Sequence, residues 1–440
     1  MDKYKEYKDV SMGWLGRIPA HWTTVPLKYS IGKSPFSFVD GDWIESKVIE
    51  SEGIRYLTTG NVGVINYKEQ GNGFISDKTF RELNCTEVFP GDVLISRLNF
   101  PIGRSCIVPD LGYRIVVAVD NVIFRPDETK YNKKYLVYQM NCYPYSENAN
   151  FIARGSTMQR ITRTQLGALK LCVPPLEEQN VMVGFLDKKC SEIDNVISAQ
   201  QKRIALLQEL KQSVITHAVT KGLNPNVEMK DSGVEWIGKV PKHWEVMKTS
   251  LAFNGIGSGT TPSTSKKEFY DDEGKYWLQT GDLNDGMIFD TSKKVSDVAI
   301  KACNLKFYPK DSVVIAMYGA TIGKVGILGI KTATNQACCV LPANKYMVAK
   351  YSFYEFFACK PALLVSAIGG GQPNISQDTI RKQKIAVPPF IEQQAIADYL
   401  DKKCDTIDSS IFKALHQVEL LQEYKQSLIT EVVTGKRKVS

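Results

Sequence analysis

Two stretches of the chain carry apolar residues at helical spacing for longer than a typical globular helix. From about Glu177 to Val219 there is no proline and a single glycine, and the apolar positions follow at steps of 4, 7, 3 and 7 residues. Such steps are typical of a coiled-coil seam, and about forty residues at about 1.5 Å each make a helix of roughly 60 Å. The pattern predicts two long helices with the pairing residues Ile193, Ile197, Ile204, Leu207 and Val214, and Ile407, Ile411, Val418, Leu421 and Leu428.

The segments around these helices occur twice. Pro19-Ala20-His21-Trp22 returns as Pro241-Lys242-His243-Trp244, at an offset of 244 − 22 = 222, and Val173-Pro174-Pro175 returns as Val387-Pro388-Pro389, at an offset of 388 − 174 = 214. A period above 200 residues is too long for a solenoid repeat. The chain is therefore expected to be a duplicated pair, in which each copy is a globular domain followed by a long helix.

The globular segments, residues 15–173 and 237–387, alternate short apolar runs with turn residues. Residues 93–95 and 114–119 in the first segment, and 312–317 and 337–340 in the second, are β-branched or apolar runs bounded by turns, which is typical of short strands. We expect mixed α/β (α+β) domains. The chain divides into a first domain (1–173), a first helix (174–222), a linker and second domain (223–387), and a second helix (388–440).

The two long helices allow two arrangements. Each helix could pack only on its neighbouring domain. Alternatively, the two helices pair antiparallel as a coiled coil, because a duplicated unit arranged about a pseudo-twofold axis buries both seams at once. In the second arrangement the paired helices would act as a ruler between the two globular domains.

Composition narrows the class of protein. Lys and Arg exceed Asp and Glu by 55 − 47 = 8, a moderate excess that is compatible with a polyanionic partner. Ten cysteines without a C-x-x-C pair and four scattered histidines do not form a zinc or disulfide framework. The charged start of the chain and the absence of a run of eighteen apolar residues favour a soluble cytoplasmic protein without a membrane partner.

Several segments imitate catalytic motifs without completing them. Phe253-Asn254-Gly255-Ile256-Gly257 resembles a loop that holds S-adenosylmethionine, but Gly, Thr, Pro and Ser follow where a helix should begin. Val387-Pro388-Pro389-Phe390 lacks the asparagine of the adenine-methyltransferase motif Asn-Pro-Pro-Phe. His21 and His243, each beside a tryptophan, have no matched carboxylate or nucleophile in the sequence pattern, which favours a packing and strand-entry role. We expect no catalytic residue and no metal site.

The order and duplication of these motifs resemble the specificity subunit of type I restriction-modification systems. The resemblance rests on the Pro-x-His-Trp segment, the domain that ends in Val-Pro-Pro, and the helix that contains Leu-Asp-Lys-Lys-Cys and later Lys-Gln-Ser, each present in both copies. It covers essentially the whole chain.

This resemblance implies a DNA-reading adaptor. Each globular domain would be a target-recognition domain that reads one half of an asymmetric bipartite site in double-stranded DNA, and the two helices would set the gap between the halves. Two methyltransferase subunits would dock on the helices and methylate adenine, and ATP-dependent restriction subunits would join them. The chain itself would bind no cofactor, because S-adenosylmethionine, ATP and magnesium would belong to the partners.

Candidates for DNA contact are polar residues in loops near glycine, where the backbone can approach a groove. Arg and Lys suit guanine or phosphate, and Asn and Gln suit adenine. The segments 155–160 and 369–374 occupy equivalent places, 369 − 155 = 214, and form the strongest pair. The candidates are Thr59, Asn61, Arg97, Asn99, Arg104, Arg154, Ser156, Gln159 and Arg160 in the first domain, and Thr280, Tyr318, Thr321, Lys324, Gln372 and Asn374 in the second.

Two other functions remain open at this point. The chain could be a bivalent scaffold that binds proteins through both halves without reading DNA. It could also be a self-contained methyltransferase, although the missing asparagine and the incomplete cofactor loop oppose that interpretation.

Overall fold

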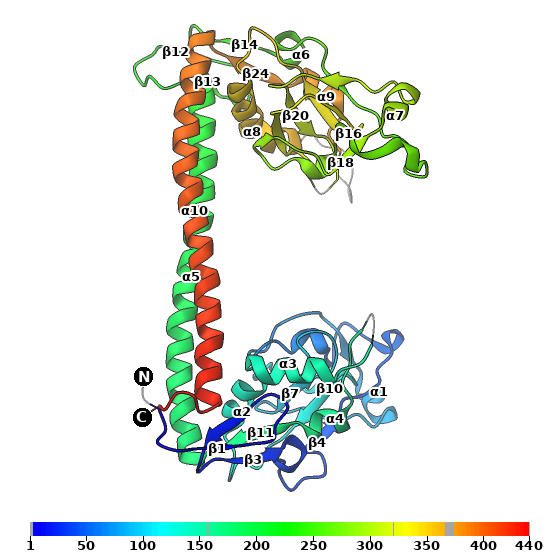
Figure 1. Cartoon of the computed structure of the whole chain (residues 1–440), viewed down its shortest axis with the longest axis vertical. Helices are drawn as coiled ribbons and strands as arrows, with labels where there is room; N and C mark the ends of the chain where they lie inside the picture. The colour runs from blue at the N-terminus through cyan, green and yellow to red at the C-terminus, as the bar shows by residue number, and fades with distance from the viewer. Residues whose placement is uncertain (1–2, 156–157, 320, 366–373, 440) are drawn as a thin grey trace. The chain divides into compact units, whose positions relative to one another are not determined.

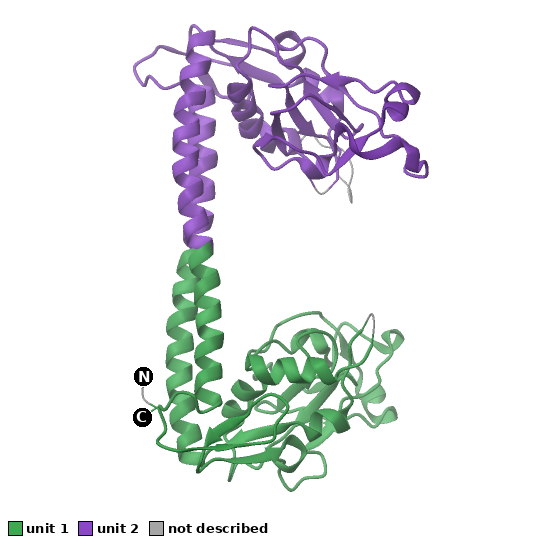
Figure 2. Cartoon of the chain, viewed as in Figure 1, with its two compact units in different colours: residues 1–200, 416–440 green, residues 201–415 purple. Residues whose placement is uncertain are grey.

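The computed structural model describes residues 3–155, 158–319, 321–365 and 374–439. Contacts divide the chain into two compact units, which Figure 2 colours separately. Unit 1 comprises residues 1–200 and 416–440, and unit 2 comprises residues 201–415. Helix α5, Leu176–Lys221, and helix α10, Phe390–Val433, each contribute to both units. Each compact unit therefore combines a globular domain with part of both helices, and its boundaries cut across the four segments used in the sequence analysis.

The globular part of unit 1 is built on a four-stranded sheet of order β4-β10-β7-β8 and a three-stranded sheet of order β6-β5-β9, with the pairs β1-β2 and β3-β11 beside the helices (Figure 1). Its strands are β1 Tyr7–Asp9, β2 Arg17–Pro19, β3 Thr23–Pro26, β4 Phe38–Asp40, β5 Ile54–Leu57, β6 Phe74–Ile75, β7 Val93–Ser96, β8 Ser105–Ile107, β9 Ile115–Val117, β10 Asn121–Phe124 and β11 Lys170–Val173. Its short helices are α1 Asp77–Glu82, α2 Lys133–Met140, α3 Tyr143–Ile152 and α4 Arg163–Ala168.

Unit 2 repeats this plan with a larger sheet. Its sheets have the orders β15-β23-β20-β21-β17 and β18-β16-β22-β19, and β12-β13 and β14-β24 form pairs. The strands are β12 Met229–Asp231, β13 Lys239–Pro241, β14 Glu245–Lys248, β15 Gly257–Ser258, β16 Tyr270–Leu278, β17 Met287–Ile288, β18 Lys293–Val295, β19 Phe307–Tyr308, β20 Val313–Ala316, β21 Val325–Leu328, β22 Thr332–Thr334, β23 Cys338–Leu341 and β24 Lys384–Val387. The helices are α6 Thr249–Ala252, α7 Asp297–Ala302, α8 Ala349–Val365 and α9 Gln377–Lys382.

The mixed α/β (α+β) prediction is confirmed in both units. The apolar runs at 93–95, 114–119, 312–317 and 337–340 coincide, to within a residue or two at each end, with β7, β9, β20 and β23, all of which are buried along their length. Both long helices are also confirmed, and α5 extends slightly beyond the predicted 177–219. Short apolar runs and long periodic patterns were sufficient here because burial of these side chains decides their local structure.

The long helices run antiparallel within each unit. In unit 1, Lys425 of α10 bonds Asp194 of α5 at 2.7 Å, while Arg437, beyond the end of α10, lies over the ring of Phe185 nearer the start of α5. In unit 2, Lys211 bonds Asp408 at 2.7 Å. None of the ten predicted seam residues is exposed: Ile193, Ile407 and Leu428 are buried, and Ile197, Ile204, Leu207, Val214, Ile411, Val418 and Leu421 are half-buried.

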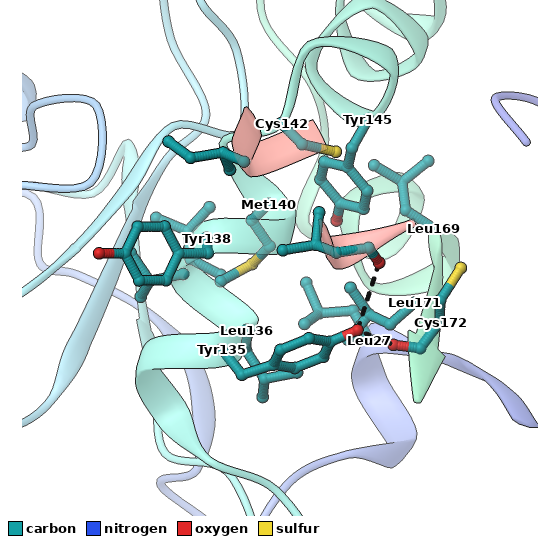
Figure 3. Close-up of a cluster of buried hydrophobic side chains, with 14 of the residues drawn as sticks. Leu27, Tyr135, Leu136, Tyr138, Met140, Cys142, Tyr145, Leu169, Leu171 and Cys172 are labelled. Atoms are coloured by element: carbon teal, nitrogen blue, oxygen red, sulfur yellow. Dashed lines mark hydrogen bonds between the residues drawn. The ribbon is translucent and has the colours of Figure 1, made fainter. Parts of the chain in front are cut away.

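The helices also pack on the globular domains, but the antiparallel pairing is confirmed, and the alternative in which each helix packs only on its neighbouring domain is wrong. The core of unit 1 combines Leu27 of a short 3-10 turn and Tyr135 and Leu136 of α2 with Leu428 and Val432 of α10. Figure 3 shows part of this cluster, in which Tyr135 donates a hydrogen bond to the Cys172 carbonyl at 3.0 Å. The apolar faces of the helices are therefore shared between the partner helix and the domain.

The His-Trp pairs attach each domain to the start of a long helix. In unit 1, Glu178 in the first turn of α5 accepts from Trp22 Nε1 at 3.3 Å and lies 2.9 Å from His21 Nε2. In unit 2, Glu392 of α10 accepts from Trp244 Nε1 at 2.9 Å, and its other oxygen lies 2.7 Å from His243 Nε2. The expectation that no carboxylate accompanies these histidines is wrong, because the partner lies about 150 residues later in the chain.

Burial of the tryptophans confirms the packing role of the same motif. Trp22 and Trp244 are fully buried and directly follow the hairpins β1-β2 and β12-β13. A carboxylate in the first turn of a helix also interacts favourably with the positive end of the helix dipole. The motif therefore positions the domain on the helix start.

A second duplicated joint lies nine residues further along each long helix, at 187 − 178 = 401 − 392 = 9. Asp187, in Leu-Asp-Lys-Lys-Cys, accepts from Tyr138 Oη at 2.7 Å and from Lys134 Nζ at 2.7 Å, both on α2. Asp401, in the second copy of the motif, accepts from Tyr354 Oη at 2.9 Å and from Lys350, both on α8. The repeated Leu-Asp-Lys-Lys-Cys segment thus contributes the same carboxylate bridge from helix to domain in each unit.

Candidate nucleic-acid interface

The candidate reading surface of unit 1 is formed by the segment after β7 and the segment before α4. Residues Leu98 and Arg160 form a β-bridge, as do Arg154 and Arg160, and the backbone N–H of Asn99 donates to Gln159 at 3.0 Å. Two loops that are some sixty residues apart in the sequence are therefore joined at their backbones. Arg154, Gln159, Arg160 and Asn99 are all exposed on the joined loops.

Unit 2 joins the corresponding loops in the same way. Tyr318, the second residue after β20, forms a β-bridge with Asn374. Thr321 and Lys324 lie on the connection between β20 and β21, where both are half-buried, whereas Asn374 is exposed. The structure therefore brings these predicted residues of unit 2 to one loop cluster. Ser156 and Gln372 lie outside the described residues.

Thr59 and Thr280 occupy equivalent 3-10 turns, Thr59–Asn61 and Thr280–Asp282, and both are half-buried. Each turn is closed by the side chain at its third position: Asn61 accepts from the backbone N–H of Thr58 at 2.9 Å, and Asp282 accepts from that of Gln279 at 2.8 Å. The echo seen in the sequence at these positions therefore reflects a shared turn.

Asn61 is a candidate that the structure reassigns to the fold. Its side chain is fully buried and donates to the carbonyls of Lys68 at 3.0 Å and Gln70 at 2.9 Å. Its amide groups are engaged within the protein, so no base edge can reach them without breaking these bonds. We therefore correct Asn61 from a DNA-contact candidate to a loop-organising residue.

Arg104 has a similar organising role. Its guanidinium donates to the carbonyls of Thr59 at 2.8 Å and Val62 at 2.7 Å in one turn, and to the carbonyl of Asn99 at 2.9 Å in a second loop. Burial lowers the pKa of this guanidinium from its ordinary value. Because its donors are directed at backbone carbonyls, Arg104 holds the candidate loops together and is not itself a free donor for DNA.

Arg97 is the third reassigned candidate. Its side chain is 5% exposed, and Nε lies 3.0 Å from Asp40 Oδ1. Its Nη2 donates to the Val119 carbonyl at 2.7 Å and lies 3.7 Å from Asp120 Oδ1. Burial lowers the pKa of Arg97, and the charge of Asp40 opposes that shift. Arg97 is an internal anchor, which sequence reasoning could not separate from an exposed loop arginine.

Three residues that the sequence analysis missed complete this cluster. Asp120 Oδ1 lies 2.8 Å from Arg160 Nη2 in an ion pair, and Asp40 Oδ2 lies 3.6 Å from Arg163 Nε. Acidic residues are not expected at an interface with a polyanion, and Asp40 is 97 − 40 = 57 positions before Arg97, so no local pattern links them. The cluster of Arg97, Arg160, Arg163, Asp40 and Asp120 is called the Arg–Asp network below.

The described residues contain no group of three or more His, Cys, Asp or Glu side chains arranged to hold a metal ion. Within the same residues, no helix is both long and apolar enough to cross a membrane. The chemistry present at the loop clusters is instead that of hydrogen-bond donors and positive charge, which suits the binding of base edges and phosphates.

Comparison with known proteins agrees with this organisation. The family described as "Type I restriction modification DNA specificity domain" matches residues 41–206 and again residues 241–420. The type I restriction enzyme MjaVIII specificity subunit of Methanocaldococcus jannaschii is 26% identical over 460 aligned residues, which cover 100% of this chain and 98% of that protein.

Solved structures share the fold. A chain from a structure reported on complex assembly and conformational transition of the type I R-M system has a TM-score of 0.71 at 15% identity, covering 96% of this chain and 99% of the other. The HsdS subunit from Thermoanaerobacter tengcongensis has a TM-score of 0.51 at 15% identity, with 96% and 98% covered. With both halves of the sequence matched by the same family and the duplicated fold shared over nearly its whole length, the chain belongs to the type I restriction-modification DNA specificity family.

Proposed function

We propose that this protein is the DNA specificity subunit of a type I restriction-modification system. Each globular domain reads one half of an asymmetric, bipartite site in double-stranded DNA, and the chain directs methyltransferase and restriction subunits to that site. The observation that carries the proposal is the duplicated loop cluster, which has the same backbone frame in both units but different exposed side chains. A shared frame with different donors suits two half-sites of different sequence.

The chain contributes recognition and not catalysis in this proposal. The segments that imitate methyltransferase motifs form other structures: Val387-Pro388-Pro389 connects β24 to the start of α10, and Gly257 lies in the two-residue strand β15. S-adenosylmethionine, ATP and magnesium are accordingly assigned to partner subunits.

Partner subunits are proposed to bind the long helices. In unit 2, these helices expose Leu206, Leu210 and Phe412 by 65%, 49% and 70% respectively. In unit 1, they expose Leu420 and Tyr424 by 50% and 51%. Large apolar side chains that recur on one pair of elements support a protein-binding surface. Two methyltransferase subunits, one for each copy of the duplicated chain, fit the repeat.

The direct test is methylation in cells. The chain is co-expressed with its methyltransferase subunit in a methylation-free host, and modified adenines are located by sequencing the genome. A split, asymmetric motif with a constant gap is the expected result. If an assembled complex produces no methylation and retains no specific DNA in gel-shift assays, the scaffold function replaces the present proposal.

The role of the helices as a ruler has a separate test. Insertion of one helical turn after Ala205 of α5 should change the length of the unspecific gap, because α5 is continuous from unit 1 into unit 2. Both half-site sequences should stay the same. A changed half-site sequence would contradict the division of the chain into readers and ruler.

A further inference from the structure

The two units present different chemistry at equivalent backbone positions, and hydrogen bonds establish the equivalence. In unit 1, the backbone N–H of Arg97 donates to the Asp120 carbonyl at 2.8 Å. In unit 2, the backbone N–H of Met317 donates to the Ala337 carbonyl at 2.8 Å. Arg97 and Met317 each come directly after the corresponding strand, β7 or β20. Arg97 therefore corresponds to Met317, and Asp120 corresponds to Ala337.

The remaining positions of the Arg–Asp network follow from the β-bridges and the strand register. The bridge Leu98↔Arg160 corresponds to Tyr318↔Asn374, so Asn374 stands in the place of Arg160. Asp40 pairs with Val122 of β10, as Ser258 pairs with Cys339 of β23.

Arg163 and Gln377 each begin the helix that follows, α4 or α9. They also make the same kind of contact, because Arg163 donates to the Phe38 carbonyl at 3.4 Å and Gln377 donates to the Ile256 carbonyl at 3.2 Å. All five charged positions of the network are therefore neutral in unit 2, where they are Met317, Asn374, Gln377, Ser258 and Ala337.

In the Arg–Asp network of unit 1, the exposed fraction of the side chains increases from the interior to the surface. The Arg97 side chain is 5% exposed, the carboxylates of Asp40 and Asp120 are 31% and 21% exposed, and Arg160 is 47% exposed. A buried guanidinium requires carboxylate partners to offset its desolvation. Those carboxylates in turn hold the outer arginines, and three guanidinium groups against two carboxylates leave one positive charge in excess.

The geometry leaves donors of Arg160 available. Its Nη2 lies 2.8 Å from Asp120 Oδ1, while the guanidinium carries five N–H donors in a planar fork. A guanidinium group held through one nitrogen can still direct two other N–H groups at a pair of acceptor atoms. The O6 and N7 atoms of guanine and the oxygens of a DNA phosphate both offer such a pair.

We propose that Asp120, seated on the buried Arg97, positions the guanidinium of Arg160 as the group through which unit 1 contacts a pair of acceptor atoms on DNA. The contact is to a guanine edge in the half-site read by unit 1 or to an adjacent phosphate. In this assignment Arg160 touches DNA, and Asp120 is a positioning residue. The inference rests on the proposed function and specifies a charged contact with DNA that unit 1 makes and unit 2, with Asn374 at the equivalent position, does not.

The test uses the complete complex with its methyltransferase subunits, and it reads the methylated motif together with the salt dependence of binding. If Arg160 contacts guanine, Arg160→Ala relaxes one base position of one half-site, with a loss of discrimination of about tenfold or more. Arg160→Lys gives a similar relaxation, because a lysine lacks the planar fork.

A phosphate contact predicts a different result for the same variants. Arg160→Ala then leaves the motif unchanged, weakens binding to all sites, and reduces the slope of log affinity against log salt by about 1. Arg160→Lys keeps the charge and restores most of the affinity. If Arg160→Ala changes neither the motif nor the salt slope, the proposed contact is wrong.

Asp120→Asn tests the positioning role separately. The expected result is the same shift as in Arg160→Ala, in the same half-site and with a smaller amplitude. Thermal unfolding is measured alongside, and a variant that only lowers Tm, with wild-type base preference and salt slope, overturns the role of Asp120. The Arg160 variants alter an exposed side chain and test the contact even where Asp120→Asn unfolds.

Asn374→Ala is the matched control in unit 2, because it truncates the equivalent neutral position. It should leave the base positions affected by Arg160→Ala unchanged. If the wild-type complex yields no bipartite motif, the proposed function fails; if it yields the motif but the Arg160 variants have no effect, only this inference fails.

Discussion

A third joint between the globular domain and the long helices has a buried amide at its centre in unit 1 and a buried carboxyl group in unit 2. Gln139 of α2 accepts from the Cys172 backbone N–H at 3.0 Å and donates to the carbonyls of Cys172 at 2.9 Å and Val433 at 3.1 Å. Glu355, at the corresponding place in α8, accepts from the Ala386 backbone N–H at 2.7 Å. Both side chains are fully buried. Both side chains therefore accept a hydrogen bond through an oxygen atom. The Gln139 amide also carries N–H donors at every pH, whereas Glu355 has a donor only when it is protonated.

The carboxyl group can replace the amide only while it is protonated. Burial raises the pKa of Glu355 to about 8, although the bonds from Ala386 and Tyr351 favour the ionised form. Tyr351 Oη lies 3.2 Å from Glu355 Oε2 and 2.8 Å from the Ala386 carbonyl. A neutral Glu355 can donate to Tyr351 and leave the tyrosine proton for the carbonyl. An ionised Glu355 competes for that proton, so the two joints differ in their response to pH.

The largest effect is expected from removal of the buried tryptophan, a feature that both units share. Trp22→Ala and Trp244→Ala each remove a fully buried tryptophan that donates to the first-turn glutamate. Each should lower the free energy of unfolding of its own unit by about 3–5 kcal/mol. Hydrogen exchange measured on peptides from each unit checks this.

Trp43→Ala is the control for those variants, because Trp43 is 72% exposed and its loss should change stability by no more than about 0.5 kcal/mol. Equal loss of protection in both units after either buried substitution would show that the units do not unfold separately.

Replacement of Glu355 tests whether the buried carboxyl group makes the stability of unit 2 depend on pH. The folded-state pKa of about 8 exceeds the ordinary value of 4.5, so the folded state holds more protons than the unfolded state between these values. Stability contributed by this group therefore falls as pH rises from about 4.5 to about 8 and then levels off. Glu355→Gln should abolish this fall and raise the unfolding free energy of unit 2 at pH 8 by a few kcal/mol.

The reciprocal variant Gln139→Glu should introduce the same pH dependence into unit 1. Unfolding free energies measured from pH 5 to pH 9 for wild type and both variants provide the test, with the difference between variant and wild type cancelling other titrations. A Glu355→Gln protein with the wild-type pH profile would contradict the assignment of a neutral carboxyl group.

The smallest effect concerns the equivalent ion pairs between the long helices. Lys425–Asp194 and Lys211–Asp408 have the same length, 2.7 Å, and the aspartates are half exposed. Double-mutant cycles with Asp→Asn and Lys→Met should give coupling energies of about 0.2–1 kcal/mol in each unit. Both should shrink in 1 M salt, where screening is strong. A clearly larger coupling in one unit would mean that the two helix pairings are not equivalent.

Local patterns predicted the elements and failed at the side-chain roles. Strands such as β7 and β20 were predictable because at least three consecutive apolar residues, all buried, admit few alternatives. In contrast, Asn61 and Arg97 looked like exposed loop residues near glycine, and only their contacts show that both are buried. The partners of His21 and His243, Glu178 and Glu392, were equally invisible, since nothing local links residues so far apart.

The sequence by itself determined the duplication, the two long helices, the mixed domains and the family, because repeated spacing and apolar periodicity are properties of the chain in one dimension. Only the tertiary structure decided that Arg97 is an anchor while Arg160 is exposed, that Asp120 joins them, and that Gln139 and Glu355 are counterparts. These roles depend on burial and on atoms brought within hydrogen-bond distance by folding. Residue type and spacing alone do not carry that information.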